Sequence, residues 1–412
     1  MTTLMAAAHV AKKGNKPDQI FAIAQAAREA IAKVGKDRVV NASLGVIYNE
    51  EEMFASFPTV ENHLKQMSAE DLMNYAAIEG NADFLQAAVE MTFQGNMPEN
   101  TYAKSVATPG GTGAIRHVIF NYLEPGQKVL VPNYFWGSYR TVAQEHHRGI
   151  DVYPLFDDNN NFDIAGFQDK VEEVLKEQDN LVIIFNSPAH NPTGYSMKET
   201  DWNQVLDFIK VCAQNKQKKI TLLLDIAYID FSGPSREARR FLRLFGGLPE
   251  NIFVTIAYSM SKSFLIYGMR SGAVVGLSSS PEVVDEFFEV NSLSNRGVWS
   301  NGTRSAQRLL ADVVKDPELR AKIEEEQTAI RGIMEKRVKI FMDEAKSVGL
   351  ETCPYQSGFF ITVPARDPRT STKKLAEDNI FVVNMEKGIR VAICGVPSHK
   401  LPGLATKIKK AL

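Results

Sequence analysis

Polar side chains of complementary chemistry follow three short apolar segments in the middle of the chain. Lys262 comes shortly after the apolar residues 252–257, and Asp225 directly follows residues 220–224. Asn191 lies beyond a third apolar segment. Because ligands in open parallel sheets bind beyond the carboxyl ends of the strands, we expect an amine, a carboxylate and an amide to meet at one edge of a sheet.

A glycine-rich segment at residues 108–114 could supply a second kind of chemistry, the binding of an anion. It precedes a helical pattern at residues 115–122, and backbone N–H groups at a helix start suit a phosphate. The spacing does not match the dinucleotide-binding fingerprint, which needs three spaced glycines and a later acidic residue. A tight turn that caps the helix is the alternative interpretation.

Lys262 taken alone is most simply a solvated surface charge. Its place after an apolar segment, with Arg270 beyond it and Asp225 after a neighbouring segment, favours a site instead. An amine, a carboxylate, cations and hydroxyls are the partners that a cofactor with an aldehyde, a pyridine nitrogen and a phosphate requires.

The strands and helices that carry these residues are predicted from the hydrophobic pattern. The short apolar segments are continuous rather than alternating, which is typical of strands covered on both faces. They lie at residues 129–131, 181–185, 220–224, 252–257 and 273–277. Helical stretches separate them, so the pattern predicts an α/β fold with a mostly parallel sheet.

The two ends of the chain have a different pattern. Residues 19–34 have the spacing of an amphipathic helix, and residues 303–347 are helical and charged, with a break at Pro317. Short strands at residues 359–363, 381–383 and 390–393 precede a basic final helix. We therefore expect a large domain at 51–302 and a smaller domain formed from 1–50 and 303–412.

Composition excludes several classes of protein. The 412 residues are 44% hydrophobic and 23% charged with a net charge of −2, whereas nucleic-acid binding needs a basic surplus. Cys212, Cys353 and Cys394 have neither metal-ligand nor paired spacing, so we expect reduced thiols and no metal. Lys12 and Lys13 follow the apolar start of the chain, the reverse of a signal peptide, and no apolar run is long enough for a membrane helix. These features predict a cytoplasmic protein.

Four motifs, in this order and spacing, are similar to those of class I aminotransferases of pyridoxal 5′-phosphate (PLP) fold type I, the aspartate and aromatic amino acid aminotransferase group. They are Gly110-Gly111-Thr112-Gly113-Ala114, Asn191-Pro192-Thr193-Gly194, Asp225-x-Ala227-Tyr228, and Ser259-x-x-Lys262 with Gly268-x-Arg270. The resemblance runs from about residue 41 to 396. It implies a large domain with a mostly parallel seven-stranded sheet sandwiched by helices, and a smaller α/β domain from both termini.

The resemblance also implies roles around the cofactor ring. Lys262 would hold PLP as a Schiff base and move the substrate proton, and Asp225 would pair with the pyridine nitrogen. Asn191 and Tyr228 would hydrogen-bond the 3′ oxygen. Trp136 would stack on the ring face, although a core tryptophan is the alternative.

For the phosphate, the resemblance implies Gly110, Gly111, Thr112, Ser259 and Arg270. Here Gly110 replaces the family's serine, which removes one hydroxyl, and we expect the backbone to retain binding. Tyr75, by the same resemblance, would reach the phosphate of a neighbouring subunit, so a homodimer with shared sites is expected.

Substrate binding is implied for a further set of residues. Arg390 resembles the arginine that clamps the α-carboxylate in a bidentate pair, with an exposed arginine as the alternative. Gly45, Trp136 and Asn191 would border the substrate, and Phe360 would add an apolar wall. Arg296 resembles the arginine that binds a side-chain carboxylate from the other subunit; otherwise it is a rim charge.

The resulting prediction is a ping-pong transaminase that moves an amino group from an aromatic or dicarboxylic L-amino acid to a 2-oxo acid such as 2-oxoglutarate. Another fold type I enzyme, a β-lyase or decarboxylase, would share Lys262 and Asp225. A non-catalytic regulatory protein is the remote alternative, and it would normally carry a basic DNA-binding extension, which the sequence before Gln19 lacks.

Overall fold

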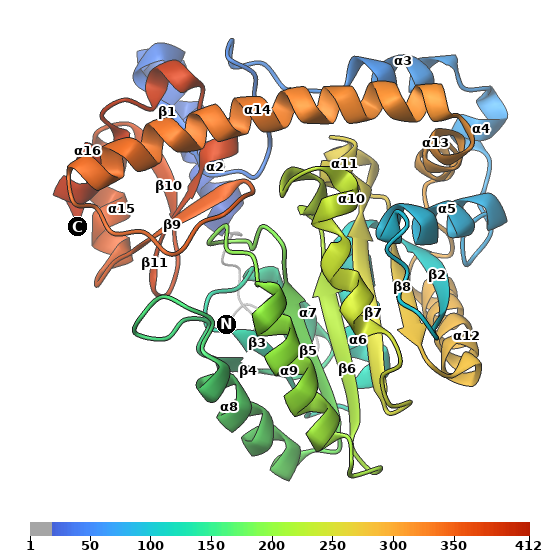
Figure 1. Cartoon of the computed structure of the whole chain (residues 1–412). Coiled ribbons are helices and arrows are strands. Elements are labelled where there is room, and N and C mark those ends of the chain that lie inside the picture. Colours follow the sequence, from blue (N-terminus) through green and yellow to red (C-terminus); the bar gives the residue numbers. More distant parts are fainter. Residues whose placement is uncertain (1–18) are drawn as a thin grey trace, which may run out of the picture.

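The computed structural model describes residues 19–412 and contains two β-sheets with helices around them (Figure 1). The expectations about the first residues, including Lys12, Lys13 and the segment before Gln19, lie outside the described residues. Among residues 19–412, no helix is long and apolar enough to span a membrane.

The larger sheet has seven strands in the order β2-β8-β7-β6-β5-β3-β4. The strands are β2 (Tyr102–Thr108), β3 (Lys128–Pro132), β4 (Gly149–Tyr153), β5 (Asn180–Asn186), β6 (Lys219–Asp225), β7 (Ile252–Ser259) and β8 (Gly272–Ser278). β8 runs antiparallel to both of its neighbours, β2 and β7, and the other pairs are parallel. The predicted mostly parallel, seven-stranded α/β sheet is confirmed.

All five predicted central strands are present, and β2 and β4 were not predicted. β4 is an edge strand with several partly exposed residues, and β2 is exposed over its first half. Neither strand has the continuous apolar run by which the covered strands were recognised, because both lie at the edges of the sheet and include exposed or half-buried residues.

Helices cover both faces of this sheet, as alternate residues of one strand demonstrate. Leu223 of β6 belongs to the core under α6 (Gly110–Tyr122), α7 (Ser138–Glu145) and α12 (Pro281–Val298). Leu222 and Leu224 belong to the core on the opposite face, with α8 (Ile164–Glu177) and α9 (Glu199–Cys212). Side chains that alternate between two apolar layers explain the unbroken apolar sequence of the strand.

The smaller sheet joins the two ends of the chain. Its order is β1-β10-β11-β9, from β1 (Val40–Ala42), β9 (Phe360–Pro364), β10 (Ile380–Asn384) and β11 (Gly388–Ala392). β1 pairs parallel to β10, so an N-terminal strand completes a C-terminal sheet. The helices beside it are α2 (Gln19–Val34), α15 (Pro368–Glu377) and α16 (Leu404–Ala411).

A long helix, α14 (Pro317–Ser347), crosses the top of the view in Figure 1, from the side of the smaller sheet to the helices beside the larger one. It follows α13 (Arg304–Lys315), and the Asp316 side chain caps its start by accepting from the backbone N–H groups of Glu318 and Leu319. This cap and Pro317 explain the predicted break. The remaining short helices are α3 (Pro58–Gln66), α4 (Ala69–Met73), α5 (Ala82–Phe93), α10 (Ser235–Ala238) and α11 (Met260–Ser263). The division into 51–302 and 1–50 with 303–412 remains a prediction.

Candidate active site

A cavity of about 480 Å³ lies beyond the carboxyl ends of β5, β6 and β7. Asp225 is the last residue of β6 and Ser259 the last residue of β7, so the parallel strands deliver both to the same edge. The predicted site residues that line this cavity are Gly45, Gly111, Thr112, Trp136, Asn191, Asp225, Tyr228, Ser259, Lys262, Arg270, Phe360 and Arg390. The structure therefore brings residues from both sheets to one place.

Lys262 lies in the short helix α11, which begins immediately after β7. Its Nζ lies 5.5 Å from the ring centroid of Tyr228 and 5.9 Å from that of Tyr267. Burial lowers the pKa of Lys262 to about 8, although the nearby Asp225 carboxylate acts in the opposite direction. The amine is therefore neutral, and able to attack a carbonyl, at a lower pH than an exposed lysine.

Asp225 is buried, and its carboxylate accepts hydrogen bonds on both oxygens. The hydroxyl of Tyr139 donates to Oδ2 at 2.6 Å, and the backbone N–H of Ala227 donates to Oδ1 at 3.2 Å. Burial raises the pKa of Asp225, and the Tyr139 hydrogen bond opposes that shift. Tyr139 was not among the predicted residues. The signal that could have identified it is its position three residues after Trp136, across the turn that precedes α7.

A cradle for an anion lies at the start of α6. The helix begins at Gly110, whose φ is +68°, and a Cβ on Gly110 would lie 3.1 Å from Nη2 of Arg270. A Cβ on Gly111 would lie 3.4 Å from Cβ of Ser259. Arg270 itself has a left-handed backbone with φ of +52° and donates to Ser261 Oγ at 3.2 Å. Free N–H groups at a helix start beside a guanidinium suit a phosphate.

Arg390 projects from β11 into the same cavity and is held by neighbours from several segments. It donates to the backbone oxygen of Ser43 at 2.8 Å and to Oδ1 of Asn191 at 3.2 Å. Its Cζ lies 4.4 Å from the centroid of the Phe360 ring. A Cβ on Gly45 would lie 2.6 Å from Cζ of Phe360, so no larger residue fits at Gly45 without movement of that ring.

The loop that carries Asn191 connects the two sheets. The backbone N–H of Asn191 donates to Asn186 Oδ1 at 2.6 Å, and the Asn186 side chain donates to the backbone oxygen of Asp225 at 2.8 Å. On the other side, Thr362 of β9 donates to the backbone oxygen of Pro192 at 2.8 Å. Asn186 thus links the ends of β5 and β6 to Asn191, a role that was not predicted.

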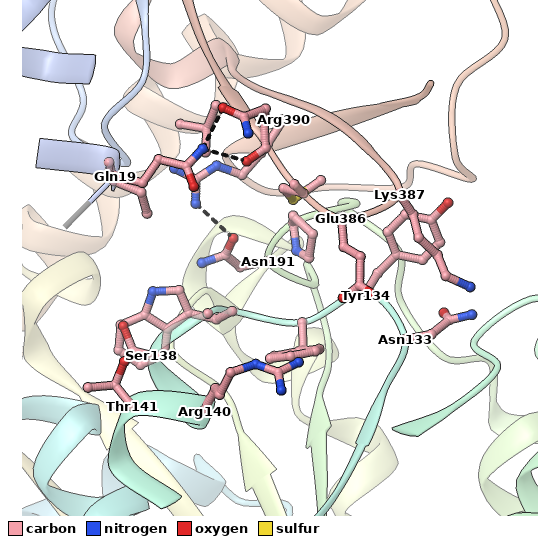
Figure 2. A pocket seen from close by; sticks show the side chains of 18 residues that line it. Gln19, Asn133, Tyr134, Ser138, Arg140, Thr141, Asn191, Glu386, Lys387 and Arg390 are labelled. Atoms are coloured by element: carbon pink, nitrogen blue, oxygen red, sulfur yellow. Dashed lines mark hydrogen bonds between the residues drawn. The ribbon is translucent and has the colours of Figure 1, made fainter. Parts of the chain in front are cut away.

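A second cavity, of about 370 Å³, borders the first (Figure 2). The two share five residues, which are Ile20, Trp136, Ser138, Asn191 and Arg390. Figure 2 shows Arg390 directed at Asn191, with Arg140 and Lys387 on other parts of the wall.

Tyr75 and Arg296 lie outside both cavities. Tyr75 follows α4 and is 82% exposed, and Arg296, near the end of α12, is exposed and donates to Ser300 Oγ at 2.7 Å. Asn295, next to Arg296, donates to the backbone oxygen of Ile78 at 2.8 Å. The segment after α4 and the end of α12 therefore lie side by side. Within one chain, neither Tyr75 nor Arg296 reaches the cavity.

The groups that line the cavity match the reactive parts of PLP. A primary amine of lowered pKa, a buried carboxylate and a phosphate cradle at a helix start open into one space. Among residues 19–412, no group of three or more histidine, cysteine or acidic residues could hold a metal ion. The arrangement thus defines a site for an aldehyde cofactor with a phosphate.

Comparison with known proteins agrees with this chemistry. The family model for aminotransferase class I and II matches residues 42–408. The solved structure of an aminotransferase from Anaerococcus prevotii DSM 20548 is 38% identical with a TM-score of 0.96, and the match covers 98% of both chains. The aspartate aminotransferase of Salmonella typhi is 28% identical over 91% of this chain and 94% of its own length. The aromatic-amino-acid aminotransferase of Pseudomonas aeruginosa is 26% identical over 64% of this chain and 64% of its own length.

The chain therefore belongs to the class I and II aminotransferases. It is a PLP-dependent transaminase that moves an amino group from an amino acid to a 2-oxo acid by a ping-pong mechanism, and the predicted fold type, cofactor and enzyme class are confirmed.

Proposed function

We propose that this transaminase uses Lys262, Asp225 and Tyr228 for catalysis and accepts aromatic or dicarboxylic L-amino acids, with a 2-oxo acid such as 2-oxoglutarate as the acceptor. The observation that carries the proposal is the shared cavity of Lys262 and Asp225 beside the start of α6. The aspartate and aromatic-amino-acid aminotransferases among the relatives support this range of donors.

Each part of PLP has a set of residues that would hold it. The phosphate would take N–H and hydroxyl groups of Gly110, Gly111, Thr112 and Ser259 with the charge of Arg270. Asp225 would bind the pyridine N–H, Asn191 and Tyr228 the 3′ oxygen, and Trp136 the ring face. Bound PLP supplies an aldehyde that exchanges amines and a ring that takes up the electron pair released at the substrate α-carbon.

The residues of the chain would then divide the work. Lys262 would hold the cofactor through its amine until the substrate amine replaces it, and would afterwards carry the α-proton on Nζ. Asp225 would keep a proton on the pyridine nitrogen, which requires its carboxylate to be charged. Arg390 would bind the α-carboxylate as a bidentate pair, since it lies beside Asn191 and against Phe360. Gly45 allows the Phe360 ring to pack closely beside that clamp, because a Cβ there would lie 2.6 Å from its Cζ.

We further propose a homodimer in which Tyr75 and Arg296 complete the partner's site. Both are exposed, and each has a largely exposed apolar residue near it in the sequence, Met73 of α4 at 77% exposure and Leu293 of α12 at 75%. A second copy of the chain packed against these side chains would remove them from water. Arg296 would then bind the side-chain carboxylate of a dicarboxylic substrate. A cytoplasmic location is part of the same proposal.

The experiment has two parts. Purified protein with PLP should show the absorption band of cofactor attached to an amine, and borohydride reduction followed by peptide mapping should locate the attachment at Lys262. Lys262→Ala should lose the covalent band and at least about 10³-fold in turnover, because the nucleophile and the proton carrier are both removed. Turnover of Lys262→Ala at the parent rate would contradict the role of Lys262.

The second part separates transamination from lyase or decarboxylase chemistry. Without an acceptor, a transaminase forms at most one 2-oxo acid per site from the donor. Beyond that first turnover, the amount of product should be proportional to the added acceptor. Product formation that does not depend on 2-oxoglutarate or another 2-oxo acid would instead support the β-lyase or decarboxylase alternative.

A further inference from the structure

Tyr139 has contacts with two of the proposed cofactor residues at once. Its hydroxyl donates to Oδ2 of Asp225 at 2.6 Å, and its ring meets the Trp136 ring edge to face, with centroids 5.6 Å apart. The Tyr139 ring also lies nearly parallel to the Phe135 ring, with centroids 6.5 Å apart. Tyr139 is 1% exposed, so the surrounding core holds the ring in place.

We propose that Tyr139 is a positioning residue that fixes the Asp225 carboxylate and the Trp136 ring relative to each other. This inference rests on the proposed roles of Asp225 and Trp136, which would hold the edge and the face of the PLP ring. With Oδ2 taken by Tyr139 and Oδ1 by the N–H of Ala227, the carboxylate has one orientation, and its remaining lone pairs are those available to the pyridine N–H.

The hydrogen bond also has an electrostatic effect. A buried carboxylate is costly to charge, and a hydroxyl donor stabilises the charged form. Burial raises the pKa of Tyr139 well above that of a free tyrosine, and the neighbouring Asp225 charge acts in the same direction. Tyr139 therefore stays protonated, and remains a donor, at the pH at which a free tyrosine ionises.

The chain offers a matched control for the test. Tyr195 is buried and donates to Oδ2 of Asp201 at 2.8 Å, and neither residue lines either cavity. Tyr139→Phe and Tyr195→Phe each remove one hydroxyl from a buried tyrosine–aspartate pair and keep the ring. Any loss that comes only from a broken buried hydrogen bond should appear in both variants as a lower melting temperature.

The full-length protein should be compared with both variants for PLP dissociation, the pH dependence of the bound-cofactor absorption band, and steady-state kinetics. Tyr139→Phe should weaken PLP binding roughly tenfold or more, because a hydrogen bond to a charged group is lost. It should also shift the pH profile of the band and lower kcat, while the KM of the donor changes less than about twofold. Tyr195→Phe should change stability alone.

A double-mutant cycle with Asp225 distinguishes a positioning role of Tyr139 from a general effect on stability. In the Asp225→Asn background, Tyr139→Phe should weaken PLP binding by less than about threefold, since the charged acceptor is already absent. If Tyr139→Phe matches Tyr195→Phe, or if its effect is unchanged in the Asp225→Asn background, the positioning role is wrong. If the parent protein itself shows no attached-cofactor band, it is the proposed function that fails.

Discussion

The amine of Lys262 illustrates how burial adjusts a single residue. Removal from water disfavours the charged form and lowers the pKa to about 8, and Arg270 adds repulsion, while Asp225 limits the shift. Asp225 experiences the opposite change, because burial also disfavours its charge and raises its pKa. Both pKa shifts favour the neutral forms of the two groups before the cofactor binds. The hydrogen bonds that Tyr139 and the N–H of Ala227 donate to Asp225 lower its pKa and so favour its charged form.

This balance predicts how PLP attachment depends on pH. Only the neutral amine attacks an aldehyde, so the rate at which the apo protein forms the attached-cofactor band should rise with pH and level off above about pH 8. An ordinary lysine would still be gaining rate near pH 10. Stopped-flow absorbance with a fixed PLP concentration measures this. A rate that continues to rise in proportion to hydroxide up to about pH 10 would contradict a lowered pKa.

Among the elements of the fold, the loop 191–194 links the small sheet to the site, through its hydrogen bonds with Thr362 of β9 and Arg390 of β11. Gly194 has φ of +77°, and a Cβ there would lie 2.1 Å from Cδ2 of Tyr355. Its backbone oxygen accepts from the N–H of Gln356 at 2.8 Å. Two requirements, a left-handed backbone and close approach of a ring, therefore coincide at one glycine.

Gly194→Ala should be destabilising and should also reduce activity. The overlap with Tyr355 must be relieved by movement of the loop, so we expect a loss of about 2–4 kcal/mol in unfolding free energy. We also expect a raised KM, because the same loop carries Asn191, which accepts a hydrogen bond from Arg390. Denaturant unfolding and kinetics measure the two effects. Gly247→Ala is the control, since Gly247 has φ of +61° but no atom within 4 Å of a new Cβ. It should lose only about 1 kcal/mol and retain its KM, and equal effects in both would refute the close-approach argument.

At the scale of the whole molecule, the proposed dimer divides one site between two chains. Lys262 and Asp225 line the cavity of their own chain, whereas Arg296 lies outside it on an exposed surface. A closed twofold interface would place the same pair of segments on both partners, so each chain would give and receive one Arg296.

Mixed dimers test this arrangement directly. Lys262→Ala and Arg296→Ala should each turn over dicarboxylic donors poorly, and Arg296→Ala should retain aromatic donors better. When the two variants are unfolded, mixed equally and refolded together, dicarboxylate activity should return to about a quarter of the parent value, because random pairing restores one intact site in each mixed dimer. Lys262→Ala mixed with Asp225→Ala should regain nothing, since both residues belong to the same chain. Absence of recovery in the first mixture would exclude sharing of Arg296.

Much of this architecture could be predicted because several residues act locally. Leu222 to Leu224 face apolar layers on both sides of the sheet, so a buried strand was recognisable from its composition, and Pro317 after Asp316 marked the start of α14. The edge strand β4 was not recognised because a partly exposed strand lacks that signature. The antiparallel direction of β8 was equally hidden, since a covered strand has the same composition in either direction.

Residue types and their order were enough to identify the groups available for chemistry. Lys262, Asp225, the glycines at the start of α6 and Arg390 lie beside recognisable strands and helices, and their order matches a family. The surroundings of these groups became known only from the folded chain. Two hydrogen bonds join residues that are far apart in the chain, one between Tyr139 and Asp225 and one between Arg390 and Asn191. The lowered pKa of Lys262 likewise results from burial by distant segments. Such contacts and their desolvation depend on how whole layers pack, which no local pattern of residue types encodes.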